Sequence, residues 1–456
     1  MGRATIGRLA RALGWGLALL VGTMLATGAS ASAASEPVVL GWGVNEAHEL
    51  SDGTTVNRAT PVEVQGLPEE VVGLSAGSGA SAALLRGGGV MTWGENLSNL
   101  GSGTEGSSLV PTPVCDVGAT HCDGGPYLDG VGSISGGGSV YLALRHDGSV
   151  VSWGFSQPGQ LGQRVAQSPV PGLVCTVWEY PCDPAHELKQ VTAIAAGQNH
   201  SLALLEDGTV LAWGDNSFGE LGVTKTAVKC AHKGYKCSYL PIPVPGLSEV
   251  TSIAAGDGFS LALTRRGTVM AWGSNVYGTL GNGRTETAKV ATPAPVCASW
   301  VKTRCKGELS EVAAIAVDGD TAFAVMRDGS VRAWGLNQQG LLGIAPGTEQ
   351  HGCPGSSECS SVPVTVAGLD GVRTMASGGA VGSQTALAQL QDDTFVTWGS
   401  GYLGTLGDGQ RESSFVPVHV CAPFAAGPCP EGPYLTGAAT AIAAGGAHVL
   451  VSIFAE

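Results

Sequence analysis

Residues 193–222 read AIAAGQNHSLALLEDGTVLAWGDNSFGELG, and this stretch contains the unit from which the chain is built. Two β-prone apolar runs, residues 201–205 and 209–213, flank Glu206-Asp207-Gly208. An Asp-Gly turn between two such runs is the strongest short-range signal of a β-hairpin. An Ile-Ala-Ala-Gly run precedes the hairpin, and a loop from Trp-Gly to Leu-Gly follows it. The stretch therefore predicts consecutive antiparallel strands, without helical periodicity.

The Trp-Gly pair of this unit recurs along the whole chain, at intervals of 51 to 64 residues. A fixed period of this size indicates one supersecondary unit that is copied and stacked. Each unit also has a proline-flanked run, which we expect at a sheet edge because proline cannot donate to a strand ladder. Four strands per unit, repeated radially, predict a β-propeller. The seven tryptophans of the pair are Trp42, Trp93, Trp153, Trp213, Trp272, Trp334 and Trp398.

One hairpin turn departs from the pattern. Five of the turns carry glycine at the position of Gly208, whereas Gln391-Asp392-Asp393 has none. Glycine is the residue that adopts a left-handed conformation without steric cost. We therefore predict a strained or a longer turn at residues 391–393.

The two ends of the chain complement each other. The last unit stops at Ile442-Ala-Ala-Gly445 and the run 448–454, with no Trp-Gly pair of its own. Residues 37–43 (PVVLGWG) supply that pair and lack the preceding Ile-Ala-Ala-Gly run. We predict an all-β fold: a seven-bladed propeller of four-stranded antiparallel blades, whose last blade takes two strands from each terminus. Such closure removes an open sheet edge that would invite aggregation.

Residues 195–204 (AAGQNHSLAL) and 212–222 (AWGDNSFGELG) closely resemble the repeat of the RCC1 family, named for the regulator of chromosome condensation. The resemblance covers residues 37–456, because the turn, Trp-Gly, Leu-Gly and proline elements recur in a fixed order. It implies a seven-bladed propeller closed by sharing strands between the termini. The best-known members are nuclear exchange factors for a small GTPase that also touch chromatin; others are secreted bacterial propellers, including an inhibitor of β-lactamases. Membership defines the fold far better than the activity.

Residues 1–34 have the features of a secretory signal peptide. Arg3, Arg8 and Arg11 form a basic start, residues 13–25 are apolar, and residues 29–34 are small. The apolar run is too short to span a bilayer comfortably. We predict a single propeller domain at residues 35–456 that is secreted or extracytoplasmic, without stable membrane insertion.

The twelve cysteines fall into six close pairs, one in each of six units. Local disulfides are the natural interpretation in an oxidising compartment. Metal binding is the alternative, since His121, His232 and His351 lie near three pairs, but two thiols and one histidine do not fill a tetrahedral zinc site. Two pairs precede the proline strand of their unit and the other four follow it, so the loops should emerge from opposite ends of the outer edge. The two preceding pairs are Cys230/Cys237 and Cys353/Cys359, and the four following pairs are Cys115/Cys122, Cys175/Cys182, Cys297/Cys305 and Cys421/Cys429.

The charge balance argues against nucleic acid as a partner. The formal net charge is −14, and loss of the three signal arginines leaves 20 basic against 37 acidic residues, a net charge of −17. An acidic surface repels phosphate backbones.

Several short strings match catalytic or cofactor motifs by letter only. Residues 101–106 and 399–404 spell G-x-G-x-x-G, but no helix follows either one, as a dinucleotide site requires. Residues 73–77 spell G-x-S-x-G, and the serine occupies a slot that is alanine in sister units. His200 and His448 share one repeat position and are expected to be structural. We predict no enzymatic activity, no cofactor and no metal.

These observations favour an exported, non-catalytic and monomeric scaffold that binds an unidentified protein partner. Phe218, Tyr277 and Tyr402 lie in Trp-Gly to Leu-Gly loops that share one rim, where aromatic residues could anchor a partner. That they only pack their own loops remains an open alternative. Two other functions stay open: a secreted inhibitor of β-lactamase-type enzymes and a cell-surface or carbohydrate adhesin. Guanine-nucleotide exchange is disfavoured by export, disulfides and acidity.

Overall fold

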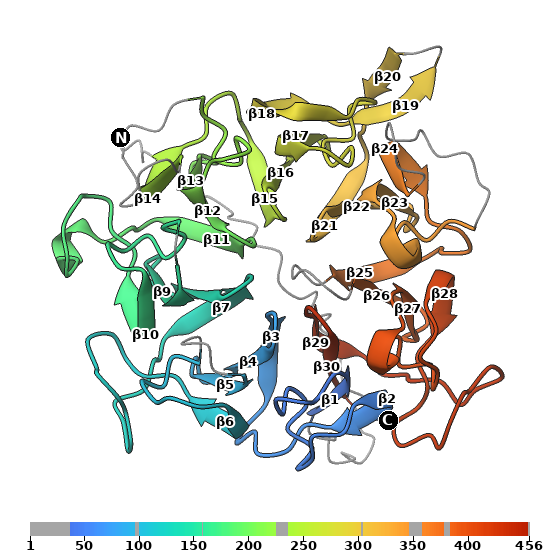
Figure 1. Ribbon diagram of the computed structural model, residues 1–456, viewed down its shortest axis with the longest axis horizontal. Helices are drawn as coiled ribbons and strands as arrows, with labels where there is room; N and C mark the ends of the chain where they lie inside the picture. The colour runs from blue at the N-terminus through green and yellow to red at the C-terminus, as the bar shows by residue number, and fades with distance from the viewer. Residues whose placement is uncertain are drawn as a thin grey trace, which may run out of the picture. The chain divides into compact units, whose positions relative to one another are not determined.

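The computed structural model describes residues 37–95, 100–156, 158–224, 236–301, 304–345, 358–377 and 384–454. These residues form seven four-stranded antiparallel sheets, arranged as blades around a central axis (Figure 1). Helical structure in the described ranges is confined to three short 3-10 turns, η1 (Pro184–His186), η2 (Gln338–Gly340) and η3 (Tyr402–Gly404). The predicted all-β propeller is confirmed.

We number the blades in chain order, and give the strands of each from the axis outward. Blade 1 contains β3 (Val71–Ala76), β4 (Ala80–Leu85), β5 (Val90–Gly94) and β6 (Ser108–Pro113). Blade 2 contains β7 (Val131–Gly136), β8 (Val140–Arg145), β9 (Val150–Phe155) and β10 (Gln167–Leu173). Blade 3 contains β11 (Val191–Ala196), β12 (His200–Leu205), β13 (Val210–Asp215) and β14 (Cys237–Pro243).

Blade 4 contains β15 (Val250–Ala255), β16 (Phe259–Thr264), β17 (Val269–Asn275) and β18 (Glu286–Pro295). A separate two-stranded hairpin, β19 (Cys297–Val301) and β20 (Arg304–Glu308), follows it. Blade 5 contains β21 (Val312–Asp318), β22 (Thr321–Met326), β23 (Val331–Leu336) and β24 (Cys359–Thr365). Blade 6 contains β25 (Val372–Ser377), β26 (Thr385–Leu390), β27 (Phe395–Gly399) and β28 (Ser414–His419).

Blade 7 is built from both termini, as predicted. Its strand order is β29 (Ala439–Ala444), β30 (His448–Phe454), β1 (Pro37–Gly43) and β2 (Arg58–Glu63). All seven residues of β1 pair with β30, from Pro37 opposite Phe454 to Gly43 opposite His448. The ring is therefore closed by main-chain hydrogen bonds between the two ends of the chain.

The hydrophobic core lies between neighbouring blades rather than in one centre. The cluster shared by blades 2 and 3, for example, contains Val140, Leu161 and Trp213, all buried. Each face of a blade is apolar and is covered by the next blade, which is how a repeat protein of this length buries its surface.

The proline-flanked runs are the outermost strands of their sheets, as predicted. A hydroxyl closes a local turn in several of them: the Oγ of Ser168 donates to the carbonyl of Val170 and that of Ser238 to Leu240, each at 2.7 Å. The ladder also shifts register between Ser168 and Gly172. Proline and irregular pairing keep an edge strand from recruiting another chain.

The turn at residues 391–393 is strained rather than longer. The amide of Leu390 donates to Thr394 O, as that of Leu205 does to Thr209 O in blade 3. Asp393 adopts a φ of 64° in the position where Gly208 has 84°. The turn length is the same in these two blades, and a non-glycine residue takes the left-handed conformation.

The glycine of each Trp-Gly pair has a structural requirement. All seven have φ between 99° and 117°. A Cβ on Gly214 would lie 2.6 Å from the carbonyl oxygen of Asn199 and 2.7 Å from the Cα of His200. The pair therefore needs glycine because the strand after the tryptophan touches the backbone of its neighbour.

Replacing Gly214 by alanine is expected to lower the free energy of unfolding by about 3 kcal/mol or more, because it adds a backbone clash to left-handed strain. Gly53→Ala is the matched control. Gly53 has a φ of 78°, but a Cβ there has no neighbour within 4 Å. This control should cost only about 1–2 kcal/mol of strain. Urea denaturation of both variants checks the difference, and equal losses would disprove the close approach.

Candidate functional site

The propeller presents two different faces. On the first, which we call the rim face, lie the turns between the two inner strands of each blade and the starts of the Trp-Gly loops. The hairpin turns lie at the other ends of the strands. Main-chain bonds link successive inner turns, from Gly138 N to Gly197 O, from Gln198 N to Gly256 O and from Asp257 N to Gly319 O. The inner turns of blades 2 to 5 are thus connected to one another on the rim face.

The tryptophans of the repeat are used to join blades. Six of them donate an indole Nε1 hydrogen bond of 2.7–2.9 Å to the carbonyl that precedes the loop leucine of the previous blade. Trp213, for instance, donates to Gln160 O, and Trp272 donates to Glu220 O. All seven side chains are fully buried. They are therefore inaccessible to a ligand.

His200 and His448 each form a histidine–serine pair across a blade boundary. The Nε2 of His200 lies 2.8 Å from Ser260 Oγ, and that hydroxyl donates to Glu220 O at 2.9 Å. Since the hydroxyl proton is directed to the carbonyl, Ser260 accepts from Nε2–H of a neutral imidazole. A catalytic pair needs the opposite direction, with histidine accepting the serine proton.

The second pair repeats this arrangement. His448 Nε2 lies 2.8 Å from Ser81 Oγ, which donates to Glu49 O at 2.9 Å. Burial lowers the pKa of His200 to about 3 and that of His448 to about 4. Both side chains are buried in the blade interfaces, and the geometry fits the predicted structural role.

Buried carboxyl groups have the opposite shift. Burial raises the pKa of Glu220 to about 8, and the charge of Asp215 adds to the shift. Burial also raises the pKa of Asp320 to about 7, aided by the charge of Asp257. Asp257 itself has a raised pKa, because of burial and the charge of Asp215. Carboxyl groups of blades 3, 4 and 5 thus act on one another along the rim face.

These shifts define a pH dependence of stability. His200 has a folded pKa below 6.5, so its contribution is complete above pH 6.5 and is lost as the pH falls toward 3. Glu220 has a folded pKa above 4.5, so its contribution is complete below pH 4.5 and is lost as the pH rises toward 8. Each full loss is of the order of 3–5 kcal/mol.

We expect His200→Phe to reduce the fall in melting temperature at acid pH, and Glu220→Gln to reduce the fall at alkaline pH. Both replacements already occupy the equivalent position in other units, as Phe259 and Gln160. Melting temperatures measured from pH 4 to 9 test this. If both variants show the same pH dependence as the wild-type protein, neither group is responsible for it.

The three predicted partner-binding aromatics lie on loops at the rim face, but on separate blades. Phe218 of blade 3 is 45% exposed, and Tyr402 of blade 6 is 60% exposed. Tyr277 of blade 4 is half-buried. Phe218 covers the inner turn of blade 4, since a Cβ on Gly258 would lie 3.0 Å from its ring. Partner binding by these residues therefore stays a prediction, and the packing alternative has one contact in its favour at Phe218.

Four of the predicted disulfides are present, and no described cysteine is a free thiol. Cys237 and Cys359 are also disulfide-bonded. Their predicted partners, Cys230 and Cys353, lie outside the described residues, as do His232 and His351. The described bonds span seven or eight residues each: Cys115–Cys122, Cys175–Cys182, Cys297–Cys305 and Cys421–Cys429.

The placement of the disulfide loops agrees with the prediction. Cys237 and Cys359 begin outer strands, whereas the four described pairs follow outer strands. The 421–429 loop, which follows the outer strand of blade 6, lies against the outer strand of blade 7. Phe424 N donates to Pro61 O, and Thr60 Oγ1 donates to Ala425 O, which joins the 421–429 loop to β2. The bond therefore stabilises a cover over an edge strand.

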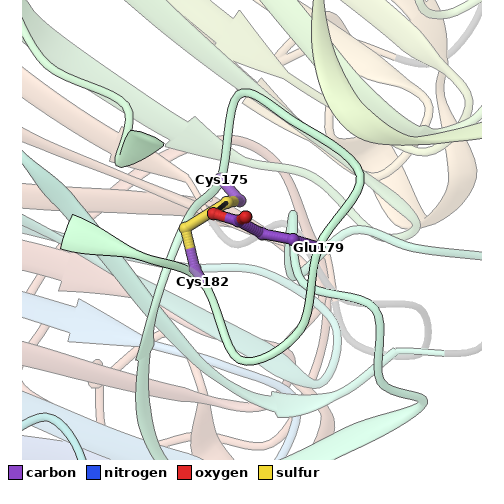
Figure 2. A group of neighbouring side chains, drawn as sticks. All are labelled: Cys175, Glu179 and Cys182. Atoms are coloured by element: carbon purple, nitrogen blue, oxygen red, sulfur yellow. Dashed lines mark hydrogen bonds between the residues drawn. A yellow bond between two sulfur atoms is a disulfide. The ribbon is translucent and has the colours of Figure 1, made fainter. Parts of the chain in front are cut away.

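Cys175, Glu179 and Cys182 form the one cluster with metal-ligand chemistry in the described part of the chain (Figure 2). Both sulfurs are in a disulfide, which removes the thiolates that a metal needs. Hydrogen bonds from Asp183 N and His186 lower the pKa of Glu179. The Glu179 carboxylate accepts hydrogen bonds within its own loop, so its role there is structural.

A cavity of about 290 Å³ follows the propeller axis and is lined by the inner strands. Most lining residues are alanine, glycine and isoleucine, and the polar side chains belong to Ser75, Ser135 and Ser377. Ser75 Oγ accepts from Gly136 N at 2.7 Å, and Ser135 Oγ accepts from Ala196 N at 3.0 Å. Ser377 donates to Val317 O. The hydroxyls are engaged between blades, so the cavity offers few groups that would fix a ligand.

Sequence reasoning missed two sets of residues. The first set is Ser81 and Ser260, which bond to the histidine of a neighbouring blade. Each stands one residue after the repeat position that is histidine in two other units, and only those histidines were singled out from the sequence. Trp178 lies outside the Trp-Gly series, which was a usable signal. Its neighbour Arg164 carried no signal, because only the fold brings the two together.

Comparison with known sequences places the chain in a family. It belongs to the RCC1-like domain family, whose sequence profile matches residues 119–452, and residues 38–84 match the regulator of chromosome condensation (RCC1) repeat. The chain is 25% identical to the ultraviolet-B receptor UVR8 of Arabidopsis thaliana, over 85% of this chain and 79% of the relative. It is 28% identical to the E3 ubiquitin-protein ligase HERC2 of Homo sapiens, over 86% of this chain but only 7% of that protein.

Solved structures agree on the fold. Prp20p from Saccharomyces cerevisiae superimposes with a TM-score of 0.70 at 20% identity, covering 92% of each chain. Human WBSCR16 gives 0.66 at 21% identity, covering 91% of this chain and 98% of the other. Among the described residues there is no helix whose length and hydropathy would let it cross a bilayer.

Proposed function

We propose that this chain is an exported, non-catalytic scaffold that binds a protein partner. The proposal depends on one observation: the side chains that stand out in the repeat form contacts between blades. The tryptophans, the histidine–serine pairs and the cavity serines all join one blade to the next. The loops lie outside these interfaces, and loops carried by a rigid scaffold are where binding residues concentrate.

Two further findings support the proposal. Short-range disulfides are typical of proteins that work in an oxidising compartment. Within the family, Prp20p was described together with its binding to Gsp1p and histones. Protein binding on a propeller of this type therefore has a precedent, while the partner of this chain is set by its own loops.

Chemical crosslinking tests the proposal. The tagged protein is recovered from its native surface or medium after crosslinking, and the attached proteins are identified by mass spectrometry. We expect a specific protein that is absent from a sample with a tagged unrelated exported protein. Substituting Phe218, Tyr277 and Tyr402 by alanine together should weaken that complex about tenfold or more if they are anchors. The absence of any specific protein would contradict the scaffold role.

A further inference from the structure

Trp178 differs from the tryptophans of the repeat. Those seven side chains are fully buried, whereas Trp178 is 46% exposed on the loop closed by Cys175 and Cys182. Tyr180, two residues further on, is 60% exposed. Large aromatic rings are usually buried on folding, and those left outside are enriched in interfaces. The pair therefore needs an explanation beyond the repeat.

The loop that carries these two rings is fixed by its own disulfide and hydrogen bonds. Glu179, which lies between them, points toward the disulfide (Figure 2). Its Oε1 accepts hydrogen bonds of 2.9 Å from Asp183 N and from His186 Nδ1. With Glu179 fixed inward and the loop closed by the disulfide, the neighbouring aromatics stay outside. A preorganised loop loses little conformational entropy on binding.

Neighbouring elements fix Trp178 further. Its ring makes an edge contact with Tyr239 of β14, with centroids 5.8 Å apart. The guanidinium carbon of Arg164 lies 4.6 Å from the centroid of the Trp178 ring. Arg164 comes from the loop between β9 and β10, so residues of blades 2 and 3 meet at this point on the edge of the propeller.

Arg164 has a free recognition edge. It is exposed, and it forms no ion pair with any carboxylate in the described ranges. Six other arginines do form such pairs: Arg58, Arg86, Arg145, Arg266, Arg327 and Arg373. A guanidinium stacked on an aromatic ring keeps its N–H groups available for two parallel bonds to a carboxylate.

We infer that Arg164, Trp178 and Tyr180 form a binding patch for a protein segment that presents a carboxylate beside an aliphatic or proline side chain. The carboxylate pairs with Arg164, and the apolar group packs on the two rings. Tryptophan, tyrosine and arginine are the residues that dominate binding energy at protein interfaces. The inference rests on the proposed scaffold function and locates one contact surface for it.

Peptide selection tests the patch while the partner itself is still unidentified. Random dodecapeptides displayed on phage are selected on the mature protein, with counter-selection on the double variant Arg164→Gln, Trp178→Ala. We expect enriched peptides in which aspartate or glutamate adjoins proline or an aliphatic residue. The Kd of an enriched synthetic peptide, measured by fluorescence anisotropy, should rise at least about tenfold for Arg164→Gln and for Trp178→Ala.

Two further variants make the test specific. Arg164→Lys should give an intermediate Kd, because lysine keeps the charge but lacks the planar fork. Arg266→Gln removes the same charge from an exposed arginine of blade 4 and should leave the Kd unchanged. Melting temperatures within a few degrees of the wild-type value confirm that each variant is folded.

Several results would overturn the patch. The first is the enrichment of basic peptides, and the second is the absence of any peptide that prefers the wild-type protein to the double variant. The third is that no peptide is selected while an oligogalacturonate binds and its binding requires Arg164 and Trp178. A different result would refute the patch and leave the scaffold function intact. In that case the peptides or a crosslinked native partner no longer bind the triple variant of Phe218, Tyr277 and Tyr402, but still bind the patch variants. Failure to crosslink any native protein would instead contradict the scaffold function.

Discussion

A chain that ends at residue 441 is expected to be insoluble or to unfold without a cooperative transition. The deletion removes β30 and half of β29 from blade 7. Val449, Leu450 and Val451 are buried, and β1 loses the strand with which all its residues pair. β1 keeps its pairing with β2, but its other side becomes an open edge that favours aggregation. Soluble yield and scanning calorimetry measure the effect.

A circular permutant is the control for this truncation. Pro37 and Phe454 are paired neighbours, so a short turn can join them, and the chain can be opened in the linker between Gly66 and Leu67. This permutant keeps every strand while changing the termini. We expect a cooperative transition within a few degrees of the wild-type protein. A truncated chain that melts like the full chain would contradict closure by the two ends.

Trp213→Ala is expected to lower the free energy of unfolding by about 3–5 kcal/mol, as for other large-to-small core substitutions. Trp213 is fully buried against Val140 and Leu161 of blade 2. Its indole also donates to Gln160 O at 2.8 Å. The substitution thus leaves a cavity and removes one of the two hydrogen bonds that Gln160 O accepts, the other coming from Ser201 Oγ. Urea denaturation measures the loss.

Two comparisons separate these contributions. Trp213→Phe keeps most of the ring and loses the hydrogen bond, so it should cost about 1–3 kcal/mol. Trp178→Ala makes the same chemical change on an exposed loop and should cost about 1 kcal/mol or less. If Trp213→Ala and Trp178→Ala are equally mild, the repeat tryptophans do not hold the blades together.

The fold was predictable because the repeat specifies it several times. The Asp-Gly turns, the proline runs and the period of the Trp-Gly pair each point to four-stranded blades, and the fragments 37–43 and 442–454 identify the closure. Local exceptions were harder. Ser51 replaces the glycine after the loop leucine and adopts a φ of 46°, while Asp393 adopts 64°. Only the strain at Asp393 was predicted, because the sequence alone does not show which backbone conformation the residue after the loop leucine adopts.

The binding surfaces were far less predictable. Phe218, Tyr277 and Tyr402 were found from their loop positions, but exposure and spacing across blades depend on packing between units. Arg164 and Trp178 are fourteen positions apart in separate segments, and no repeat pattern links them. Their contact follows from the position of the disulfide loop between two blades. The same holds for Ser260 and His200, which come from different repeats.

The intact mass of the protein recovered outside the cytosol, measured without reduction, tests the account most directly. We expect a chain that begins near Ser35 and weighs twelve hydrogens less than its sequence, with six disulfides and no free thiol. A protein that retains residues 1–34 and carries twelve free thiols would contradict an exported scaffold.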